Sequence, residues 1–289
     1  MDILVIGGNR FVGRSLVVAL QFRRHRVTVL NRASLATPPG VEHLVADRST
    51  AAFDTALARR RFDGVVDFAA FTGDDARRAI RVVNTDHYIA ISSGQVYLVR
   101  EGATAPFRET DYAGPVMSAP PTPAEHPDWE YGIGKREVED VFATAPFLAT
   151  RLRIPMVSGE GDPKQRYEKY LRNILAGGPL VVPRADQIAR HVYRGSLVDA
   201  LLRLVEEPPP ASGAFNFCQR EQPTVRELVE LIAAAARAPR PEIVDGTTTD
   251  SPFSSRWMSC LDPSALDFPH VPLEQYVYAT VQHILSGPL

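Results

Sequence analysis

Short apolar runs alternate with amphipathic stretches along the first half of this chain. Apolar runs of five to seven residues predict β-strands at Asp2–Ile6, Arg26–Leu30, Glu42–Ala46, Gly64–Phe68, His87–Ser92 and Leu148–Ile154. Stretches with helical spacing are found at Val12–Arg23, Ala51–Arg60, Asp74–Val83 and Glu130–Ala143. Nearly continuous apolar strands are typical of parallel sheets that helices cover on both faces. The pattern therefore predicts an α/β fold with a doubly wound parallel sheet.

The second half has a different pattern, with more helix and only short apolar stretches. Helices are predicted at Lys164–Ala176, Ser196–Glu207, Thr224–Arg237 and Leu273–Leu285. An apolar stretch lies at Leu180–Val182, and a short strand is predicted at Ala214–Phe217. Thr224 and Glu227 have the spacing of a reciprocal N-terminal cap. We expect a larger domain over residues 1–155 and a smaller C-terminal α/β substrate lobe over 156–289, with some chain crossing back to the sheet.

A long segment between Tyr97 and Glu130 is rich in proline and glycine and has no clear period. It predicts a long loop, and such loops in compact domains are usually functional or flexible.

Composition and charge narrow the class of protein. The 289 residues carry a formal net charge of -2 and contain two cysteines, Cys218 and Cys260. No nucleic acid partner is expected without a net positive field, and no disulfide framework or metal site is expected from two cysteines. The chain enters its first strand without an apolar leader, and no segment approaches the ~20 apolar residues that cross a bilayer. A cytoplasmic location without membrane contact is expected.

The first strand runs into a glycine turn and then a helix, which is the start of a Rossmann domain. Gly7 permits the tight turn, and Gly13 lets the helix lie close to the strand. The helix N-terminus then presents free N–H groups and a positive dipole end to a pyrophosphate. The turn predicts a dinucleotide site; a tight turn without a ligand is the alternative.

The end of the second strand bears on the choice of cofactor. An acidic residue there usually holds the ribose of NAD, whereas this chain has Asn31 and Arg32. Arg10, within the glycine turn, adds a second guanidinium that would suit a 2'-phosphate. NADP(H) is therefore favoured, and NAD(H) remains possible if Arg32 is only a solvated charge. Further contacts with the cofactor are expected at Asp47, Ala69 and Ala70.

Tyr131 and Lys135 carry the clearest chemical signal. Residues four apart share a helix face, so the lysine would lower the pKa of the phenol and hold the nicotinamide ribose. The phenol could then exchange a proton with a hydroxyl or carbonyl while hydride moves to or from nicotinamide. The serines at the end of the strand His87–Ser92 would polarise the reacting oxygen.

These motifs resemble the extended short-chain dehydrogenase/reductase superfamily, specifically the NAD-dependent epimerase/dehydratase family. The turn Gly7–Gly13 is similar to Gly-Gly-Thr-Gly-Phe-Ile-Gly, with Arg10 in place of the middle glycine. Ser93–Tyr97 is similar to Ser-x-x-Val-Tyr, and Tyr131 with Lys135 matches Tyr-x-x-x-Lys. Arg151–Asp162 is similar to the segment Arg-x-x-Asn-Val-Tyr-Gly-Pro-Gly-Asp, and Arg190 begins a stretch similar to Arg-Asp-Phe-Ile.

The resemblance implies specific site residues. The catalytic residues would be Ser93, rather than Ser92, with Tyr131 and Lys135. The cofactor would contact Gly7, Asn9, Arg10, Phe11, Val12, Gly13, Asn31, Arg32, Asp47, Ala69, Ala70, Tyr131, Lys135 and Pro155. The substrate would contact Ser93, Gln95, Met156 and Arg190. Arg256 and Trp257 could also face it.

Departures from the family's motifs narrow the reaction. Gly94 and Gln95 stand where the family's 4,6-dehydratases and decarboxylases carry acids, and an amide cannot act as acid or base. Met156 replaces an asparagine that contacts nucleotide sugars, which favours a less polar small molecule despite Arg190. An NAD(P)-dependent reductase or a redox-neutral epimerase is expected, and the resemblance also implies a homodimer.

Two other classes of function remain open from the sequence. Relatives of the chloroplast stem-loop-binding proteins share the arginine in the glycine turn and bind RNA. Cofactor-sensing regulators form a third class, although such members usually lose the Tyr-Lys pair.

Overall fold

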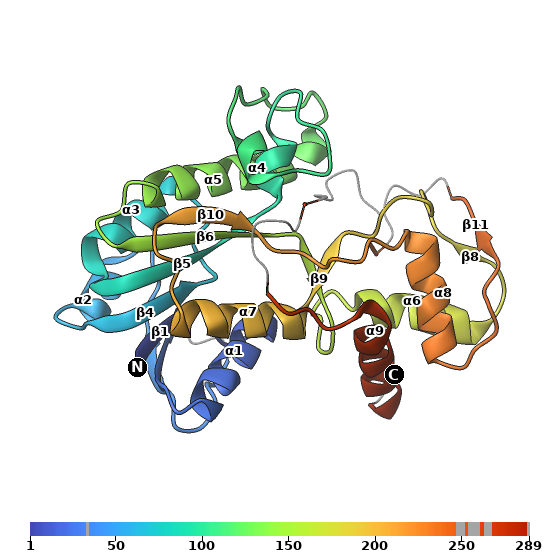
Figure 1. The fold of residues 1–289 in the computed structure, drawn as a ribbon, viewed down its shortest axis with the longest axis horizontal. Helices are drawn as coiled ribbons and strands as arrows, with labels where there is room; N and C mark the ends of the chain where they lie inside the picture. Colours follow the sequence, from blue (N-terminus) through green and yellow to red (C-terminus); the bar gives the residue numbers. More distant parts are fainter. Residues whose placement is uncertain (33–34, 247–251, 254–260, 263–267, 288–289) are drawn as a thin grey trace.

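A computed structural model describes residues 1–32, 35–246, 252–253, 261–262 and 268–287 of this chain. Its centre is a seven-stranded sheet, in which the strands run in the order β10-β6-β5-β4-β1-β2-β3 and every neighbouring pair is parallel (Figure 1). The strands are β1 (Asp2–Ile6), β2 (Arg26–Asn31), β3 (Glu42–Val45), β4 (Phe62–Asp67), β5 (Thr85–Ser93), β6 (Leu148–Ile154) and β10 (Gly213–Asn216). The predicted doubly wound parallel sheet is confirmed, and its order reverses between β1 and β4.

Helices cover both faces of the sheet because alternate residues of each strand are apolar on opposite sides. Ile3 and Val5 pack with α1 (Phe11–Phe22) and α7 (Arg194–Glu206) on one face. Leu4 and Ile6 pack on the other face. The helices on that second face are α2 (Ala51–Leu57), α3 (Gly73–Val82) and α5 (His126–Phe142). In Figure 1, α5 runs along the top of the sheet and α2 lies at its left end.

The smaller lobe has its own apolar core, at the right of Figure 1. Its helices are α6 (Arg166–Ala176), α8 (Val225–Ala235) and α9 (Leu273–Ser286), and its strand pairs are β8 (Leu180–Val181) with β11 (Ile243–Val244) and β7 (Met156–Ser158) with β9 (His191–Tyr193). Thr224 and Glu227 form the predicted capping box at the start of α8. No helix in the described part of the chain is long and apolar enough to cross a membrane.

The chain returns from the lobe to the sheet. Helix α7 packs against α1, and β10 pairs with β6 at the edge of the sheet. Helix α7 and strand β10 therefore pack on and extend the seven-stranded sheet, although they follow the first elements of the lobe in the sequence.

The proline-rich segment between β5 and α5 contains more structure than expected. It holds α4 (Gln95–Leu98) and two short 3-10 helices, Glu109–Tyr112 and Pro123–Glu125. Helix α5 also begins at His126 rather than at the predicted Glu130, with a proline in its first turn.

Candidate functional site

The glycine turn after β1 leaves the N-terminus of α1 open. Gly7 has φ +86°, which an L side chain rarely adopts. A Cβ at Gly13 would lie 2.8 Å from the Cα of Gly8, so the helix packs on the turn at backbone distance. Arg10 is the N-cap residue of α1, and its side chain is exposed. The local geometry is that of a phosphate-binding turn.

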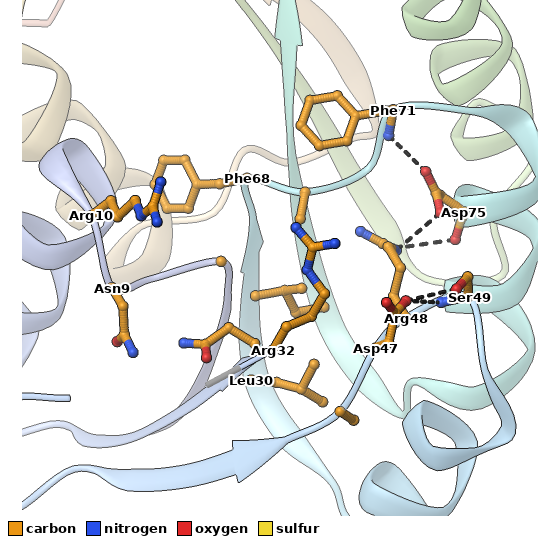
Figure 2. Close-up of a pocket in the computed structure, with 15 residues that line it drawn as sticks. Asn9, Arg10, Leu30, Arg32, Asp47, Arg48, Ser49, Phe68, Phe71 and Asp75 are labelled. Carbon is orange, nitrogen blue, oxygen red and sulfur yellow. Dashed lines mark hydrogen bonds and ion pairs between the residues drawn. The ribbon is translucent and has the colours of Figure 1, made fainter. Parts of the chain in front are cut away.

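A cavity of about 610 Å³ lies beside this turn, where the strand order reverses (Figure 2). Predicted residues that line it are Gly7, Asn9, Arg10, Asn31, Arg32, Asp47 and Ala69. Lining residues that the sequence analysis missed are Ile6, Leu30, Ala46, Arg48, Ser49, Phe68, Phe71 and Asp75. The other predicted cofactor residues do not line the cavity: Phe11, Val12, Gly13, Ala70, Tyr131, Lys135 and Pro155.

Asn9 gives the cavity a buried hydrogen-bond acceptor. Its Nδ2 donates to the carbonyl of Leu35 at 2.5 Å, which ties the turn to the segment after β2. Its Oδ1 is buried and has no partner among the described residues. An unsatisfied buried acceptor is rare in proteins, so this oxygen fits a ligand that brings a donor.

Two arginines offer positive charge to the cavity. Arg10 and Arg32 have exposed side chains and no ion pair among the described residues. Figure 2 shows the Arg32 guanidinium reaching across the cavity from the end of β2. Asn31 points its Oδ1 at His43 Nε2, 3.0 Å away. Asp47 accepts from the hydroxyl and N–H of Ser49, and these hydrogen bonds lower its pKa.

Arg48, in contrast, is already neutralised. It pairs with the buried carboxylate of Asp67 at 2.9 Å and with Asp75 at 3.4 Å. Asp67 also accepts from the Tyr88 hydroxyl at 2.6 Å and from the N–H of Ala69 at 2.7 Å. This cluster fixes the loop after β4. Of the described arginines that line the cavity, Arg10 and Arg32 are therefore the two that can bind a phosphate.

The two serines at the end of β5 point in different directions. Ser92 is buried and donates to the carboxylate of Glu139. Ser93 accepts from the N–H of Gln95 at 3.2 Å, and it lies close enough to the phenol of Tyr131 to act on the pKa of that phenol. The geometry thus brings Ser93, and not Ser92, to the predicted acid.

Lys135 is buried directly behind Tyr131. Only 2% of the lysine is exposed, compared with 37% of the tyrosine. Its Nζ donates to the carbonyls of Ala70 at 2.6 Å and Ile91 at 2.8 Å. Burial lowers the pKa of Lys135 to about 8. The Nζ lies 5.7 Å from the centre of the Tyr131 ring.

The direction of the tyrosine pKa differs from the expectation. Burial raises the pKa of Tyr131, and the hydrogen bond with Ser93 only partly opposes it. The expected net lowering of the Tyr131 pKa was wrong for the protein alone, because the loss of water around the phenolate outweighs the stabilisation that its neighbours supply.

Two glycines let α5 approach its neighbours closely enough to place these side chains. A Cβ at Gly134 would lie 2.3 Å from the carbonyl oxygen of Phe71, and one at Gly132 would lie 2.9 Å from that of Gln95. The two glycines between Tyr131 and Lys135 are therefore required for the close packing of α5, which the four-residue spacing of Tyr131 and Lys135 alone does not indicate.

A buried polar network supports α5 from below. Glu139 forms an ion pair with Arg153 at 2.6 Å, and both side chains are 3% exposed. Arg153 also donates to the Tyr97 hydroxyl at 2.7 Å, which donates to Asn216 Oδ1 at 2.8 Å. Asn216 donates in turn to the carbonyl of Phe107 at 2.9 Å. The network ties α5, β6, β10 and the proline-rich segment together.

The predicted substrate residues are spread over the two halves of the fold. Gln95 begins α4 next to Ser93, and its buried Oε1 has no partner among the described residues. Met156 packs against the core of the lobe. Arg190 is 3% exposed, and its Nε and Nη1 have no partner within the described part of the chain. Arg256 and Trp257 lie outside the described residues.

Comparison with known proteins agrees with this geometry. The family model of the NAD dependent epimerase/dehydratase family matches residues 3–218. The 2'-dehydrokanamycin reductase of Streptomyces kanamyceticus is 31% identical over 92% of this chain and 78% of its own length. A chloroplast stem-loop binding protein of 41 kDa from Arabidopsis thaliana is 25% identical over 88% of this chain and 68% of its own.

Solved structures show the same fold. UDP-glucuronic acid 4-epimerase from Bacillus cereus, in complex with NAD, superposes with a TM-score of 0.74 at 17% identity, covering 99% of both chains. The match of the family model and the identity with the reductase confirm the resemblance. The chain therefore belongs to the NAD-dependent epimerase/dehydratase family, and it is an enzyme that uses a nicotinamide cofactor.

Proposed function

We propose that this enzyme is an NADP(H)-dependent reductase of a ketone on a small, sugar-like molecule. The observation that carries the proposal is the pairing of Ser93 with Tyr131 in front of the buried Lys135, next to Phe71 of the dinucleotide cavity. The identity with 2'-dehydrokanamycin reductase supports reduction of a keto sugar. Such a reduction requires no carboxylate next to Ser93, where this chain has Gly94 and Gln95.

The residues of this chain then divide the chemistry between them. Gly7, Asn9 and Arg32 would hold a nicotinamide dinucleotide, which when bound would supply the hydride. Ser93 donates a hydrogen bond to the substrate carbonyl oxygen, and Tyr131 gives that oxygen its phenol proton. A phenol with its ordinary pKa of about 10 is neutral at pH 7. Burial raises the pKa of Tyr131 further, so the side chain holds the proton that it gives as the acid. The ammonium of Lys135 stabilises the phenolate that the transfer leaves behind.

The charges around the cavity favour NADP(H) over NAD(H). Arg10 and Arg32 are unpaired among the described residues, and no acid stands at the end of β2 to hold a ribose diol. The solved relatives named with NAD share less than a fifth of their residues with this chain. Their preference therefore does not transfer, and we assign the 2'-phosphate to the two free guanidiniums.

Titration of the protein with NADPH and NADH tests this choice. Arg32→Ala should weaken NADPH binding by roughly 10- to 100-fold, the worth of a charge-assisted hydrogen bond, and leave NADH unchanged. Arg240→Ala, an exposed arginine of the lobe, is the matched control and should change neither. Equal binding of the two cofactors by the wild type, or no uptake of either, would contradict the assignment.

The reaction itself is tested with a panel of keto sugars and keto aminosugars. Stoichiometric NADPH consumption is expected, and Tyr131→Phe should reduce turnover by roughly 10²- to 10⁴-fold without loss of cofactor binding. Tight retained cofactor with no net consumption would instead identify a redox-neutral epimerase.

The RNA-binding alternative is not favoured. Ser93, Tyr131 and Lys135 meet in one site, and binding of RNA requires none of these contacts. A salt-dependent gel shift with stem-loop RNA remains the direct test of that alternative.

The proposal also includes the domain boundaries, the location of the enzyme in the cell and its association into dimers. Residues 1–155 form the dinucleotide-binding domain, and residues 156–289 form the substrate-binding lobe. The enzyme acts in the cytoplasm. Two copies associate through α3 and α5, which lie side by side on one face of the sheet, and light scattering would report the resulting mass.

A further inference from the structure

Phe71 stands between the dinucleotide cavity and the predicted acid. It follows β4, lines the cavity and is 50% exposed. Its ring centre lies 6.3 Å from that of Tyr131 and 4.7 Å from Nζ of Lys135. No motif of the sequence singles this residue out, yet it touches both catalytic side chains.

The buried ammonium of Lys135 forms no ion pair with a carboxylate of the described residues. The charged groups around it are Asp67 on β4, Asp75 on α3, Glu139 on α5 and Arg48 after β3. Arg48 occupies both aspartates. Glu139 is likewise occupied, because it forms its ion pair with Arg153. An ammonium taken out of water without a counter-ion must find its compensation elsewhere.

The compensation comes from two carbonyls and two aromatic faces. The carbonyls of Ala70 and Ile91 accept two of the three N–H donors of Lys135. The ring of Phe71 lies 1 Å closer to Nζ than the ring of Tyr131. Cation–π attraction is strongest where the cation is desolvated, as it is here with 2% of Lys135 exposed.

The backbone around Phe71 is fixed by contacts with α3 and α5. Gly134 packs against its carbonyl oxygen, where a Cβ would approach to 2.3 Å. Its N–H donates to the carboxylate of Asp75 at 2.9 Å. The N–H of Gly73 donates to Glu137 of α5 at 3.1 Å. The segment is thereby locked against the helix that carries Lys135.

We propose that Phe71 is a positioning residue whose ring face keeps the Lys135 ammonium charged and seated beside Tyr131. This inference rests on the proposed function for its catalytic meaning, since the charge of Lys135 is what stabilises the tyrosine phenolate. The ring itself takes no proton and makes no bond to the reacting atoms.

The small number of lysines makes the charge of Lys135 directly measurable. The chain contains three lysines, Lys135, Lys164 and Lys169, so ¹³Cε-lysine labelling gives three NMR signals to follow with pH. Lys164→Arg and Lys169→Arg assign them. The Lys135 signal of the wild type should titrate near pH 8.

Phe71→Leu keeps an apolar cover but removes the π face. The titration midpoint of Lys135 in this variant should fall by roughly 0.5 to 1.5 pH units. A shift of this size is equivalent to the free energy of a cation–π contact with a desolvated cation. Phe71→Met should behave in the same way, and Phe71→Tyr, which retains the ring, should keep the wild-type midpoint. Phe22→Leu is the matched control at an 88% exposed position on α1, and it should change nothing.

A Lys135 midpoint in Phe71→Leu and Phe71→Met equal to or above that of the wild type would overturn the inference. The measurement needs neither cofactor nor substrate. Failure of NADPH to bind would therefore refute the proposed function while leaving this result intact, and an unmoved midpoint in a protein that binds NADPH would refute the inference alone.

Discussion

Replacing Gly134 by alanine sets two effects of opposite sign against each other. Alanine in a helix interior is favoured over glycine by about 1 kcal/mol, so helix propensity alone predicts a more stable protein. The added Cβ would, however, lie 2.3 Å from the carbonyl oxygen of Phe71, where ordinary contacts begin at 3.4 Å. The obstacle is a backbone atom, which no side-chain rotation can move aside.

Relief of this overlap requires α5 and the segment after β4 to separate by roughly 1 Å, and overpacking of this kind typically costs about 1 to 3 kcal/mol. The same movement stretches the 2.6 Å hydrogen bond from Lys135 to the carbonyl of Ala70, a charged bond that contributes about 1.5 to 3 kcal/mol. The losses exceed the propensity gain, and we expect Gly134→Ala to destabilise the protein by about 2 kcal/mol.

Thermal unfolding measures the outcome. A loss of about 2 kcal/mol corresponds to a fall in Tm of about 3 °C in a chain of this size. Gly132→Ala is the matched comparison, since its nearest atom is a side-chain methyl of Val99 at 2.6 Å and its nearest backbone oxygen lies at 2.9 Å. It should lose less stability. A Gly134→Ala protein as stable as the wild type, or more so, would show that the helix contact does not limit substitution and refute the reasoning.

Three further predictions concern single polar side chains. Glu139→Gln removes the charge that balances Arg153 and should destabilise the fold by roughly 3 kcal/mol or more in urea unfolding; a loss below 1 kcal/mol contradicts the network. Burial lowers the pKa values of His87 and His191 from 6.5 to about 4, so the unfolded chain takes up protons first as the pH falls. Stability should be intact above pH 6.5 and decline down to pH 4, by up to roughly 3 kcal/mol per histidine, and His87→Asn should flatten that decline. Tyr131→Phe should unfold at the wild-type temperature within 1 or 2 °C, since its partly exposed hydroxyl contributes about 0.5 kcal/mol.

Regular alternation of apolar and helical segments was sufficient to predict the sheet. Strand Asp2–Ile6 has the predicted bounds, because a strand buried on both faces leaves a nearly unbroken apolar run. Strand Leu148–Ile154 also has the predicted bounds, although Arg151 and Arg153 interrupt its apolar residues. The short strands β7, β8, β9 and β11 were harder to predict from the sequence, because two or three residues are too few to show the alternation of a strand. The first turn of α5 was missed because Pro127 is as common in loops as in the first turn of a helix.

The candidate site was predictable where its residues are close in the sequence. Gly7 and Gly13 share one turn, and Tyr131 and Lys135 share one helix face, so spacing alone indicates them. Phe71 and Arg48 escaped prediction because their roles depend on contacts between separate segments of the chain. The predicted direction of the Tyr131 pKa shift was wrong for a related reason. The spacing of two residues indicates that a charge is near the phenol, but it does not indicate how much water the phenol loses on burial.

The return of the chain from the lobe to the sheet means that the cofactor-binding half is not a continuous piece of polypeptide. A fragment ending at Pro155 would lack β10, and the backbone groups of β6 would form an open edge free to pair with other copies. It would also lack α7, and the apolar side of α1 would face water. Anyone who grafts this nucleotide-binding half onto another protein must therefore carry residues 194–216 along with it.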